Sequence, residues 1–328
     1  MKAITYSKFG PAADVLELHD LPTPDPAPGE VLVRLSHSGA NPSDVKARAG
    51  SRPGVTRPPF PQIIPHSDGA GEIVAVGEGV DPARVGEAVW IWNGQWRRAF
   101  GTAADHIALP AEQAVRRPDW ISAEVGATLG IPGLTAAHAV LGGGDVAGKT
   151  LLVSGGGGAV GHNAVQLAAW AGARVIATCS PRDADRVRAA GAAEVLDYRD
   201  PDLPAKLIDM TDGRGIDRAV ETEFGVNAQM LAEAMAENGT VAAYGSALDM
   251  NPVLPFGAYL FKAITIDIVL IYLLQAAPRQ AAIDALHNAI KEGALSPAIH
   301  ARFALADCAK AHACIEAGGR AGAVLLET

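Results

Sequence analysis

The run SGGGGAVG, over residues 154–161, has glycines at the GxGxxG spacing of a dinucleotide phosphate-binding loop. In a chain with 36 glycines this spacing is a weak signal, and a flexible Gly/Ser hinge has a similar composition. A hinge would have polar, aperiodic flanks. Here an apolar strand is expected over 151–154 and an Ala-rich helix over 159–171. A strand, a glycine loop and a helix in this order indicate a nucleotide-binding loop.

Each glycine of the motif has a physical reason in such a loop. Gly156 permits the tight turn, Gly158 lets the backbone approach a pyrophosphate, and Gly161 lets the helix pack closely on the strand. Ala159 and Val160 lie in the first turn of the expected helix, where backbone N–H groups bind anions. We expect all five residues to contact the cofactor.

The end of the second strand indicates which dinucleotide is bound. A site for NAD has a carboxylate there to hold the ribose 2′-hydroxyl. In this chain Cys179 occupies that place, and Ser180 and Arg182 follow. A hydroxyl and a guanidinium suit a 2′-phosphate, so NADPH is the expected cofactor. Asp183 and Asp185 lie close by and weigh against this prediction.

The elements around the loop predict an α/β fold with a doubly wound parallel sheet. From residue 149 onward apolar strands alternate with helices of 10–15 residues, which is the Rossmann pattern. Tyr198 ends the third strand at the rim where Ser180 lies, and its hydroxyl could reach the phosphate or simply pack. Gly245 and Ser246 end the fifth strand, where backbone groups line a cofactor site.

The remaining segments predict a second, β-rich domain. Short β-branched runs bounded by Pro and Gly fill the first third of the chain. A helical pattern begins after Ser122, a plausible N-cap. The segment 298–328 reads as a β-rich tail that folds back on the first domain. The apolar run 264–274 reads as one core strand, which could pair with a second copy of the chain to form a homodimer or lie under the C-terminal helix.

The composition excludes several classes of partner. The chain has 328 residues, of which 49% are hydrophobic and 19% charged, and a net charge of −9. This acidic balance argues against nucleic acid or an anionic membrane as the main partner. No apolar run is long enough to span a membrane as a helix. Three scattered cysteines and no recognisable leader favour a reduced, cytoplasmic setting.

Several segments together resemble the medium-chain dehydrogenase/reductase superfamily, most closely its zinc-free NADPH:quinone oxidoreductases, the zeta-crystallin-like group. They are MKAITYSKFG, GANPSDVKARAG, IPHSDGAGEIVAVGEGV, WIWNGQWRRAFGTAADHIALP, LGIPGLTAAHAV, VSGGGGAVG and GGRAGAVLL. The resemblance implies a GroES-like β-barrel catalytic domain over 1–122 and 269–328, and a Rossmann NADPH-binding domain over 123–268.

The same resemblance bears on zinc. Where zinc alcohol dehydrogenases have a cysteine ligand this chain has Asn41, and Ser67 stands at their histidine ligand, with His66 one place early. The four clustered cysteines of their structural zinc lobe are absent, and the nine histidines form no HxxxH or HxH pair. A catalytic zinc needs three good ligands. The sequence therefore predicts no metal, and we expect His66 to be a turn residue.

The resemblance also implies the catalytic residues. Asn41 would lie beside the nicotinamide as a neutral donor where zinc would sit, unless it only forms an Asn-Pro turn. Lys46, where many relatives have tyrosine, would steady an enolate or the cofactor phosphates, or else be a solvated lysine. Asp44 would pair with a cation or cap its helix. Thr135 matches a threonine near the nicotinamide ribose.

Without a Lewis acid, alcohol oxidation is disfavoured, whereas hydride transfer to an acceptor that is already electrophilic remains feasible. We therefore expect an NADPH-dependent reductase of a quinone or an α,β-unsaturated carbonyl. Two alternatives stay open: an enoyl-thioester reductase of the enoyl-CoA type, and a non-catalytic, crystallin-like protein that binds NADPH.

Overall fold

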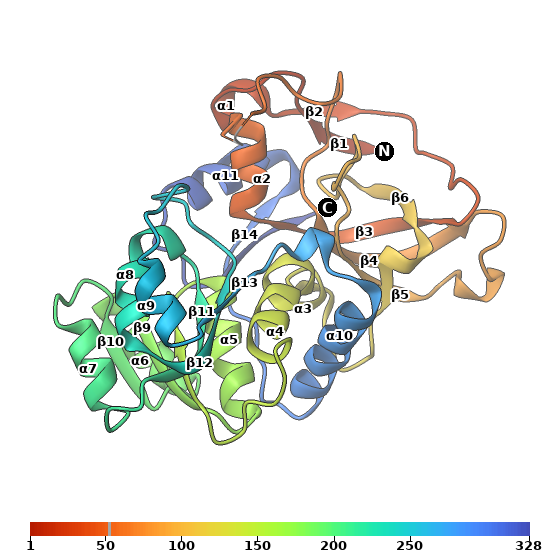
Figure 1. Cartoon of the computed structure of the whole chain (residues 1–328). Coiled ribbons are helices and arrows are strands. Elements are labelled where there is room, and N and C mark those ends of the chain that lie inside the picture. Colours follow the sequence, from red (N-terminus) through yellow and green to blue (C-terminus); the bar gives the residue numbers. More distant parts are fainter. Residues whose placement is uncertain (52–53) are drawn as a thin grey trace. The chain divides into compact units, whose positions relative to one another are not determined.

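The computed structural model describes residues 1–51 and 54–328 and divides the chain into two compact units (Figure 1). Unit 1 comprises Met1–Pro132 and Pro297–Thr328, and unit 2 comprises Gly133–Ser296. The glycine loop belongs to unit 2, whereas Asn41, Asp44 and Lys46 belong to unit 1.

Unit 2 is built on a six-stranded parallel sheet with the order β10-β9-β8-β11-β12-β13. This is the strand order 3-2-1-4-5-6 of the Rossmann fold, with its switch point between β8 and β11. The strands are β8 (Thr150–Val153), β9 (Arg174–Cys179), β10 (Glu194–Asp197), β11 (Ile216–Glu221), β12 (Met235–Ala243) and β13 (Thr265–Ile268). The expected α/β fold with a doubly wound parallel sheet is confirmed.

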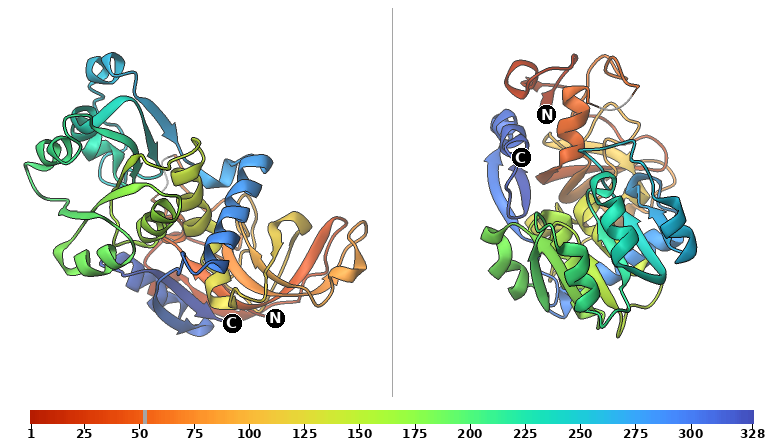
Figure 2. Two further views of the ribbon diagram at one scale, coloured as in Figure 1. Left: turned by 90° about the horizontal axis from the view of Figure 1, so that it is seen from below. Right: turned by 60° about the vertical axis from the view of Figure 1, so that its left-hand side comes forward.

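Helices connect and cover these strands, as Figures 1 and 2 show. They are α4 (Leu134–Leu141), α5 (Ala159–Trp170), α6 (Ala184–Ala189), α7 (Leu203–Asp209), α8 (Phe224–Ala234), α9 (Phe256–Phe261) and α10 (Ala276–Lys291). Apolar strand residues such as Leu152 and Val241 are fully buried and pack with helix residues such as Leu207 and Leu231 in one hydrophobic cluster. Burial of this cluster holds the carboxyl ends of the strands in fixed positions around the glycine loop.

Unit 1 is built on a mainly antiparallel seven-stranded sheet with the order β14-β15-β3-β4-β5-β7, with β6 also pairing with β3, and on the separate pair β1-β2. Its strands are β1 (Lys2–Thr5), β2 (Glu17–Asp20), β3 (Glu30–Ala40), β4 (Asp68–Val76), β5 (Ala88–Ile91), β6 (His106–Pro110), β7 (Ala114–Arg116), β14 (Ile299–Ala304) and β15 (Ala323–Glu327). Its α-helices are α1 (Ala12–Val15), α2 (Pro42–Ala49), α3 (Ala123–Gly126) and α11 (Cys308–Glu316). The tail rejoins the first part of the chain through β15, where Val324 faces Ala40 of β3.

The boundaries of the units differ from those expected. The sequence assigned 269–296 to the β-rich domain, but this segment belongs to unit 2 because α10 packs against α4. Two contacts fix its end to α5: Trp170 Nε1 donates to Glu292 Oε2 at 2.7 Å, and Ser296 N donates to Gln166 Oε1 at 2.9 Å. The first boundary lies after Pro132 rather than after Ser122.

Three expected elements also need correction. The run 264–274 is not one strand, since β13 ends at Ile268 and a 3₁₀ turn follows over Ile271–Leu273. The tail 298–328 contains the helix α11 between its strands. The helix expected after Ser122 is broken by a π-type turn over Leu129–Gly133, although the Ser122 cap is confirmed because Val125 N donates to Ser122 Oγ at 3.2 Å. Within the described residues no helix is long and apolar enough to cross a membrane.

Candidate active site

The glycine loop joins β8 to α5 at the switch point of the parallel sheet. Gly156 N donates to Thr178 O at 2.8 Å, which ties the loop to the end of β9. A Cβ on Gly161 would lie only 2.2 Å from the carbonyl oxygen of Gly155, so this position requires glycine. A Cβ on Gly158 would meet only that same oxygen, at 3.5 Å, and otherwise faces open space. The loop therefore offers an open backbone surface at a helix N-terminus, as a phosphate site needs.

The first turn of α5 starts with Ala159 and Val160, both half-buried. The N–H groups of a first helical turn have no intrahelical acceptor, and the helix dipole adds partial positive charge there. All five residues expected from the sequence thus lie in this loop and the first turn of α5, with Gly158 exposed and Gly156 and Gly161 buried.

The two expected ligands of the 2′-phosphate contact a carboxylate. Ser180 Oγ donates to Asp183 Oδ2 at 2.9 Å, and Arg182 Nε lies 3.3 Å from the same oxygen. Arg186 NH2 lies 3.3 Å from Asp183 Oδ1 and donates to the carbonyl of Gly157. Burial raises the pKa of Asp183, but the hydrogen bonds outweigh it and the net pKa is lowered. Two guanidinium groups therefore flank the single carboxylate of Asp183.

Tyr198 lies at the same rim because of strand register. β10 pairs with β9 in parallel, with Asp197 opposite Cys179, so Tyr198 and Ser180 leave the sheet at the same edge. The Tyr198 side chain is 58% exposed, and the Arg199 guanidinium lies 5.4 Å from the centre of its ring. The Tyr198 side chain is thus accessible at this rim, whereas the Arg199 guanidinium is paired with both oxygens of Asp197.

A buried carboxylate at the end of β11 was missed by sequence reasoning. Glu221 has no exposed surface, and its Oε1 accepts hydrogen bonds from Glu223 N and from Asn227 Nδ2, the latter at 3.0 Å. Burial raises its pKa, and the hydrogen bonds, including one from Ser154, partly offset this. Its Oε2 has no hydrogen-bond partner in the described structure. The available signal was an acidic residue at the end of an apolar strand.

Gly245 and Ser246 follow β12 as expected. A Cβ on Gly245 would lie 2.4 Å from the carbonyl of Thr222, so the close approach of the two strand ends requires glycine. Ser246 Oγ accepts a hydrogen bond from Gly225 N at 2.8 Å and donates to the carbonyl of Asp249. Ser246 therefore holds the loop after β12 against the start of α8, and its hydroxyl is already engaged within the protein.

In unit 1, Asn41 lies at the start of α2 beside two carboxylates. Its backbone N–H donates to Asp44 Oδ2 at 2.8 Å. Its side-chain Nδ2 donates to Asp68 Oδ2 at 2.8 Å and lies 3.5 Å from the carbonyl of Gly39. Asp44 thus caps the helix, the alternative that the sequence left open. One amide hydrogen of Asn41 is firmly held, and the other is held only by a long contact.

Asp68 fixes the side chain of Asn41 and was not singled out from the sequence. It is completely buried, and Ile131 N donates to both of its oxygens, at 2.9 and 3.0 Å. A Cβ on Gly130 would lie 2.1 Å from Asp68 Oδ1, so the turn before α4 must have glycine there. Burial raises the pKa of Asp68 well above its usual range, although the hydrogen bonds from Ile131 and Asn41 oppose this.

Two further predicted residues, Lys46 and Thr135, lie on helices of the two units. Lys46 is exposed on α2, as a solvated helix lysine would be. Thr135 is buried in the first turn of α4 in unit 2. Their expected roles toward substrate and cofactor remain predictions.

Metal-ligating side chains converge at two places within residues 1–51 and 54–328. They are His66 with Cys308 and His312, all buried, and His37 with Glu124 and Glu327 at the surface. Neither group is at residues 41 and 67, where zinc alcohol dehydrogenases have ligands and this chain has the amide of Asn41 and the hydroxyl of Ser67. In the surface group Arg302 binds both oxygens of Glu124 and neutralises it.

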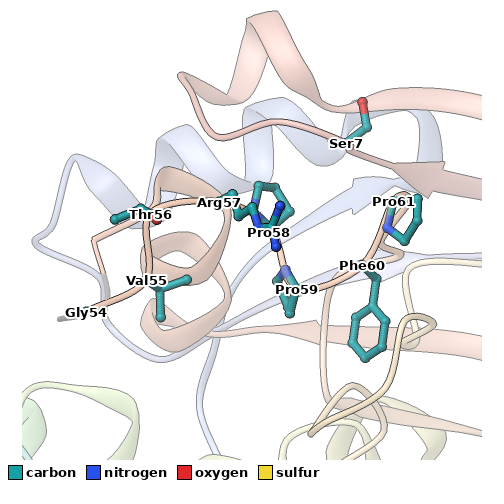
Figure 3. Close-up of a pocket in the computed structure, with 9 residues that line it drawn as sticks. All are labelled: Ser7, Gly54, Val55, Thr56, Arg57, Pro58, Pro59, Phe60 and Pro61. Carbon is teal, nitrogen blue, oxygen red and sulfur yellow. The ribbon is translucent and has the colours of Figure 1, made fainter.

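A pocket of about 620 Å³ lies in unit 1, formed by the segment 54–61 and Ser7 (Figure 3). Its lining is mostly proline and other apolar side chains, with Arg57 as its charged residue among those described. The pocket contains none of the residues predicted to be catalytic.

Sequence families match both units. Residues 27–119 match the alcohol dehydrogenase GroES-like domain, and residues 159–288 match the zinc-binding dehydrogenase family. A relative of Arabidopsis thaliana, the chloroplast envelope quinone oxidoreductase homolog, is 32% identical over 335 residues, covering 100% of this chain and 98% of its own length.

Solved structures match the whole chain as well. A mycobacterial protein in complex with NADPH superposes with a TM-score of 0.89 at 27% identity, covering 100% of both chains. The quinone oxidoreductase of Pseudomonas syringae superposes with a TM-score of 0.87 at 29% identity, covering 100% of this chain and 99% of its own.

Proposed function

Because the chain belongs to the quinone oxidoreductase family of the medium-chain dehydrogenase/reductase superfamily, and is thus an oxidoreductase, we propose that it transfers a hydride from NADPH to a quinone or an α,β-unsaturated carbonyl without a metal. The observation that carries the proposal is the glycine loop at the switch point of the parallel sheet, open at Gly158 and flanked by Arg182 and Arg186, which contact Asp183.

The residues of unit 2 suit NADPH. The backbone of Gly156, Gly158 and Gly161 would bind the pyrophosphate at the N-terminus of α5. Ser180 and Arg182 would bind the 2′-phosphate by exchanging part of their contact with Asp183 for the new anion. Arg186 would hold the rim in place through Gly157. The relative solved with NADPH supports this choice of cofactor.

NADPH supplies the hydride when bound, and the chain must then stabilise the negative charge that develops on the acceptor oxygen. Asn41 suits this task because Asp68 fixes its amide through one hydrogen, at 2.8 Å. Its second amide hydrogen has only the 3.5 Å contact with Gly39, so an acceptor oxygen placed along the direction of this hydrogen could replace that contact at little cost. Asp44 keeps the backbone of Asn41 at the helix start.

Zinc independence rests on the chemistry of the available ligands. An amide at residue 41 and a hydroxyl at residue 67 are poor zinc ligands beside the thiolates and imidazoles that zinc prefers. The described His, Cys and carboxylate groups offer no substitute set at these two positions. We therefore propose an acceptor that is already electrophilic rather than an alcohol that needs a Lewis acid.

Enoyl-thioester reduction and a non-catalytic NADPH-binding role remain the competing proposals. One experiment separates all three: the purified chain and NADPH are mixed in parallel with 1,4-benzoquinone, a short enone and crotonyl-CoA, and the nicotinamide absorbance is followed. Turnover of the quinone or the enone supports the proposal, and turnover of crotonyl-CoA alone supports the thioester reductase. Tight NADPH binding without any turnover would overturn both enzymatic proposals.

We further propose that the protein is a cytoplasmic homodimer formed through unit 2. β13 ends the six-stranded sheet, so its outer edge is free to pair with another strand in the described unit. Large apolar side chains are exposed around it: Leu248, Met250, Val253, Phe256, Leu260, Phe261, Ile268, Leu270 and Leu273. A second copy of the chain related by a two-fold axis would cover this surface and extend the sheet.

A further inference from the structure

Two histidines and a cysteine meet in the buried core of unit 1. Cys308 and His312 lie four residues apart on α11 and so share one helix face, while His66 lies in the turn just before β4. The Nε2 atoms of His66 and His312 are 2.9 Å apart, and Cys308 Sγ lies 3.9 Å from His66 Nε2. All three side chains are buried, and their ligand atoms lie within 4.8 Å of one another.

A chain of hydrogen bonds fixes which nitrogen of His66 has the proton. Thr102 Oγ1 donates its hydrogen to the carbonyl of Asp68 at 2.6 Å. Ser38 Oγ, 2.8 Å from Thr102 Oγ1, must therefore donate to Thr102. Ser38 Oγ then accepts from His66 Nδ1, at 2.9 Å. With the proton on Nδ1, the free lone pair of His66 is on Nε2 and faces the other two side chains.

This arrangement is the usual one for a metal-binding histidine, whose second nitrogen donates to a fixed partner that orients the ring. His312 differs, because its buried Nδ1 has no hydrogen-bond partner in the described structure. The proton of His312 is held on Nε2 by the lone pair of His66 Nε2, 2.9 Å away, whereas Nδ1 is left without a partner among the described residues. With the proton moved to Nδ1, Nε2 is free for a ligand.

The backbone at His66 is a second, independent observation. Its φ is +75°, in the left-handed region that favours glycine and that few other residues adopt, histidine being among the less rare of them. Strained backbone of this kind persists where the surrounding structure enforces it, and it gathers at functional positions. Here it directs a buried imidazole at the one face of α11 that presents a thiol and a second imidazole.

We propose that His66, Cys308 and His312 form a structural binding site for one thiophilic d¹⁰ cation, Zn²⁺ or Cu⁺, that ties α11 to the turn before β4. Two imidazoles and a thiolate are the ligands that these ions prefer. The site supplies three protein side chains in a closed core, so a tetrahedral Zn²⁺ would need a fourth ligand, such as a water molecule.

The interatomic distances need only small changes, but both rings must also tilt, because centres 5.2 Å apart with Nε2 atoms 2.9 Å apart place the two Nε2 atoms end to end. Nitrogen and sulfur ligands of a tetrahedral zinc, at about 2.0 and 2.3 Å from the ion, lie about 3.3 to 3.6 Å from each other. The two Nε2 atoms must therefore separate by a few tenths of an ångström, and the sulfur must approach by a similar amount. In the metal-free state the rings, 18° from coplanar and with centres 5.2 Å apart, share an N–H···N hydrogen bond that the ion replaces.

The proton and charge balance is simple. The proton of His312 moves from Nε2 to Nδ1, the S–H bond of Cys308 breaks, and one proton leaves to solvent as the sulfur–metal bond forms. No oxidant is needed. The thiolate leaves Cu⁺ neutral and Zn²⁺ with one positive charge, and the carboxylate of Asp44 is close enough to interact electrostatically with Cys308. The adjacent guanidinium of Arg48 is itself paired with Glu316.

A metal ion at this site would also affect the segment that follows His66. His66 lies two residues before Asp68, whose carbonyl belongs to the same hydrogen-bond chain through Thr102. A bound cation would hold this turn, and with it the carboxylate that contacts Asn41. The metal site itself does not depend on the proposed reaction.

The test measures metal content in the full-length protein and three variants. Cys308→Ala removes the sulfur ligand, and His66→Gly places glycine where φ favours it, so that this variant is expected to fold even without the ligand. Cys314→Ala is the matched control, because Cys314 lies on the same helix outside the cluster. Zn²⁺, or Cu⁺ under reducing anaerobic conditions, is supplied during expression and afterwards, because the site is buried. Excess metal is removed by desalting, and the remainder is quantified by mass spectrometry.

We expect one equivalent of metal in the wild type and in Cys314→Ala, and at least a tenfold loss in the other two variants. Co²⁺ substitution should give the near-ultraviolet band of a thiolate–cobalt bond in the wild type but not in Cys308→Ala. If the wild type contained less than one equivalent of metal, the two histidines would form only a hydrogen-bonded pair, and the proposed metal site would be wrong. Equal content in all four proteins would reveal an adventitious ion elsewhere and overturn it too.

Discussion

Asn41 Nδ2 donates to Oδ2 of the completely buried Asp68 at 2.8 Å, so a carboxylate that solvent cannot reach sets the orientation of the amide. Because burial raises the pKa of Asp68 well above its usual range, this orientation depends on pH. A protonated Asp68 would have a hydrogen to donate and would no longer need the N–H of Asn41.

Asp68→Asn tests whether this contact positions Asn41 for catalysis. An asparagine at residue 68 can still accept a hydrogen bond from Ile131 N. Its neutral side chain would bind the amide hydrogen of Asn41 more weakly than the carboxylate does. A hydrogen bond to a charged group contributes about 1.5–3 kcal/mol, so we expect kcat to fall by about 10- to 100-fold. The KM for NADPH should stay within about twofold, since the cofactor residues lie in unit 2.

The pH profile separates positioning from simple loss of structure. Wild-type kcat should fall as pH decreases through the raised pKa of Asp68, and the Asn variant should lack this acid limb. Asp20→Asn, at an 81% exposed side chain, serves as the control. An unchanged kcat in Asp68→Asn would remove Asp68 from the mechanism.

Two alanine substitutions in the glycine loop should have opposite effects. Gly161→Ala forces a Cβ to 2.2 Å from a backbone oxygen, and we expect a loss of about 1–3 kcal/mol in stability. Gly158→Ala adds its methyl group to open space, so its melting temperature should match the wild type. If a pyrophosphate approaches the loop there, the NADPH dissociation constant of Gly158→Ala should rise by at least about tenfold. Unchanged binding in a fluorescence titration would argue against the phosphate loop.

Arg182→Ala should affect the reaction with NADPH but not the reaction with NADH. The side chain is 59% exposed, so its removal should leave stability unchanged. Losing a guanidinium–phosphate contact should lower kcat/KM for NADPH by about 10- to 100-fold and leave NADH unaffected. Arg188→Ala, at a similarly exposed arginine that pairs with Asp185, should change neither. Equal losses with both cofactors would assign Arg182 a structural role through Asp183.

Local sequence patterns predicted the parallel sheet, the glycine loop and the cap at Ser122, because these depend on residues close together in the chain. The boundary after Ser296 could not be predicted in this way. It depends on Glu292 and Ser296 meeting α5, more than a hundred residues away. The tail was misread as β-rich because Ala and Cys residues form an amphipathic helix, α11, whose buried face shows only once the sheet is assembled.

The same reason explains the site residues that the sequence did not reveal. Asp68 and Glu221 are acidic residues in apolar strands, and their importance follows from burial and from partners such as Ile131 and Asn227. A search of histidine spacing could not join His66 to His312, which are 246 residues apart in the chain. Spacing rules detect ligands on one helix, whereas these three come from a turn and a helix that β-sheet formation brings together.

The proposed dimer can be disrupted by charge at the exposed apolar surface of unit 2. Phe261 is 87% exposed and Ile268, at the end of β13, is 69% exposed. Phe261→Asp combined with Ile268→Lys should shift the mass measured by light scattering from two chains to one, because burying both charges would be costly. Substituting Val85→Asp, at a 50% exposed residue of unit 1, should not. A wild type that is monomeric at micromolar concentration would rule out this interface.

His162 should make the stability of unit 2 depend on acid pH. Burial on α5, followed by the nearby charge of Arg186, lowers its pKa from 6.5 to about 4, and its side chain is only 7% exposed. Between these pH values the unfolded chain binds a proton at this position that the folded chain does not, so stability falls as pH decreases from 6.5 to 4. The full shift corresponds to a loss on the order of 3 kcal/mol in the free energy of unfolding.

His162→Gln cannot titrate. The free energies of unfolding measured in urea at pH 7 and at pH 4.5 should therefore differ less for this variant than for the wild type. His19→Gln, at a 40% exposed side chain, provides the comparison and should behave as the wild type. Parallel losses in all three proteins would mean that other groups, and not His162, govern the acid transition.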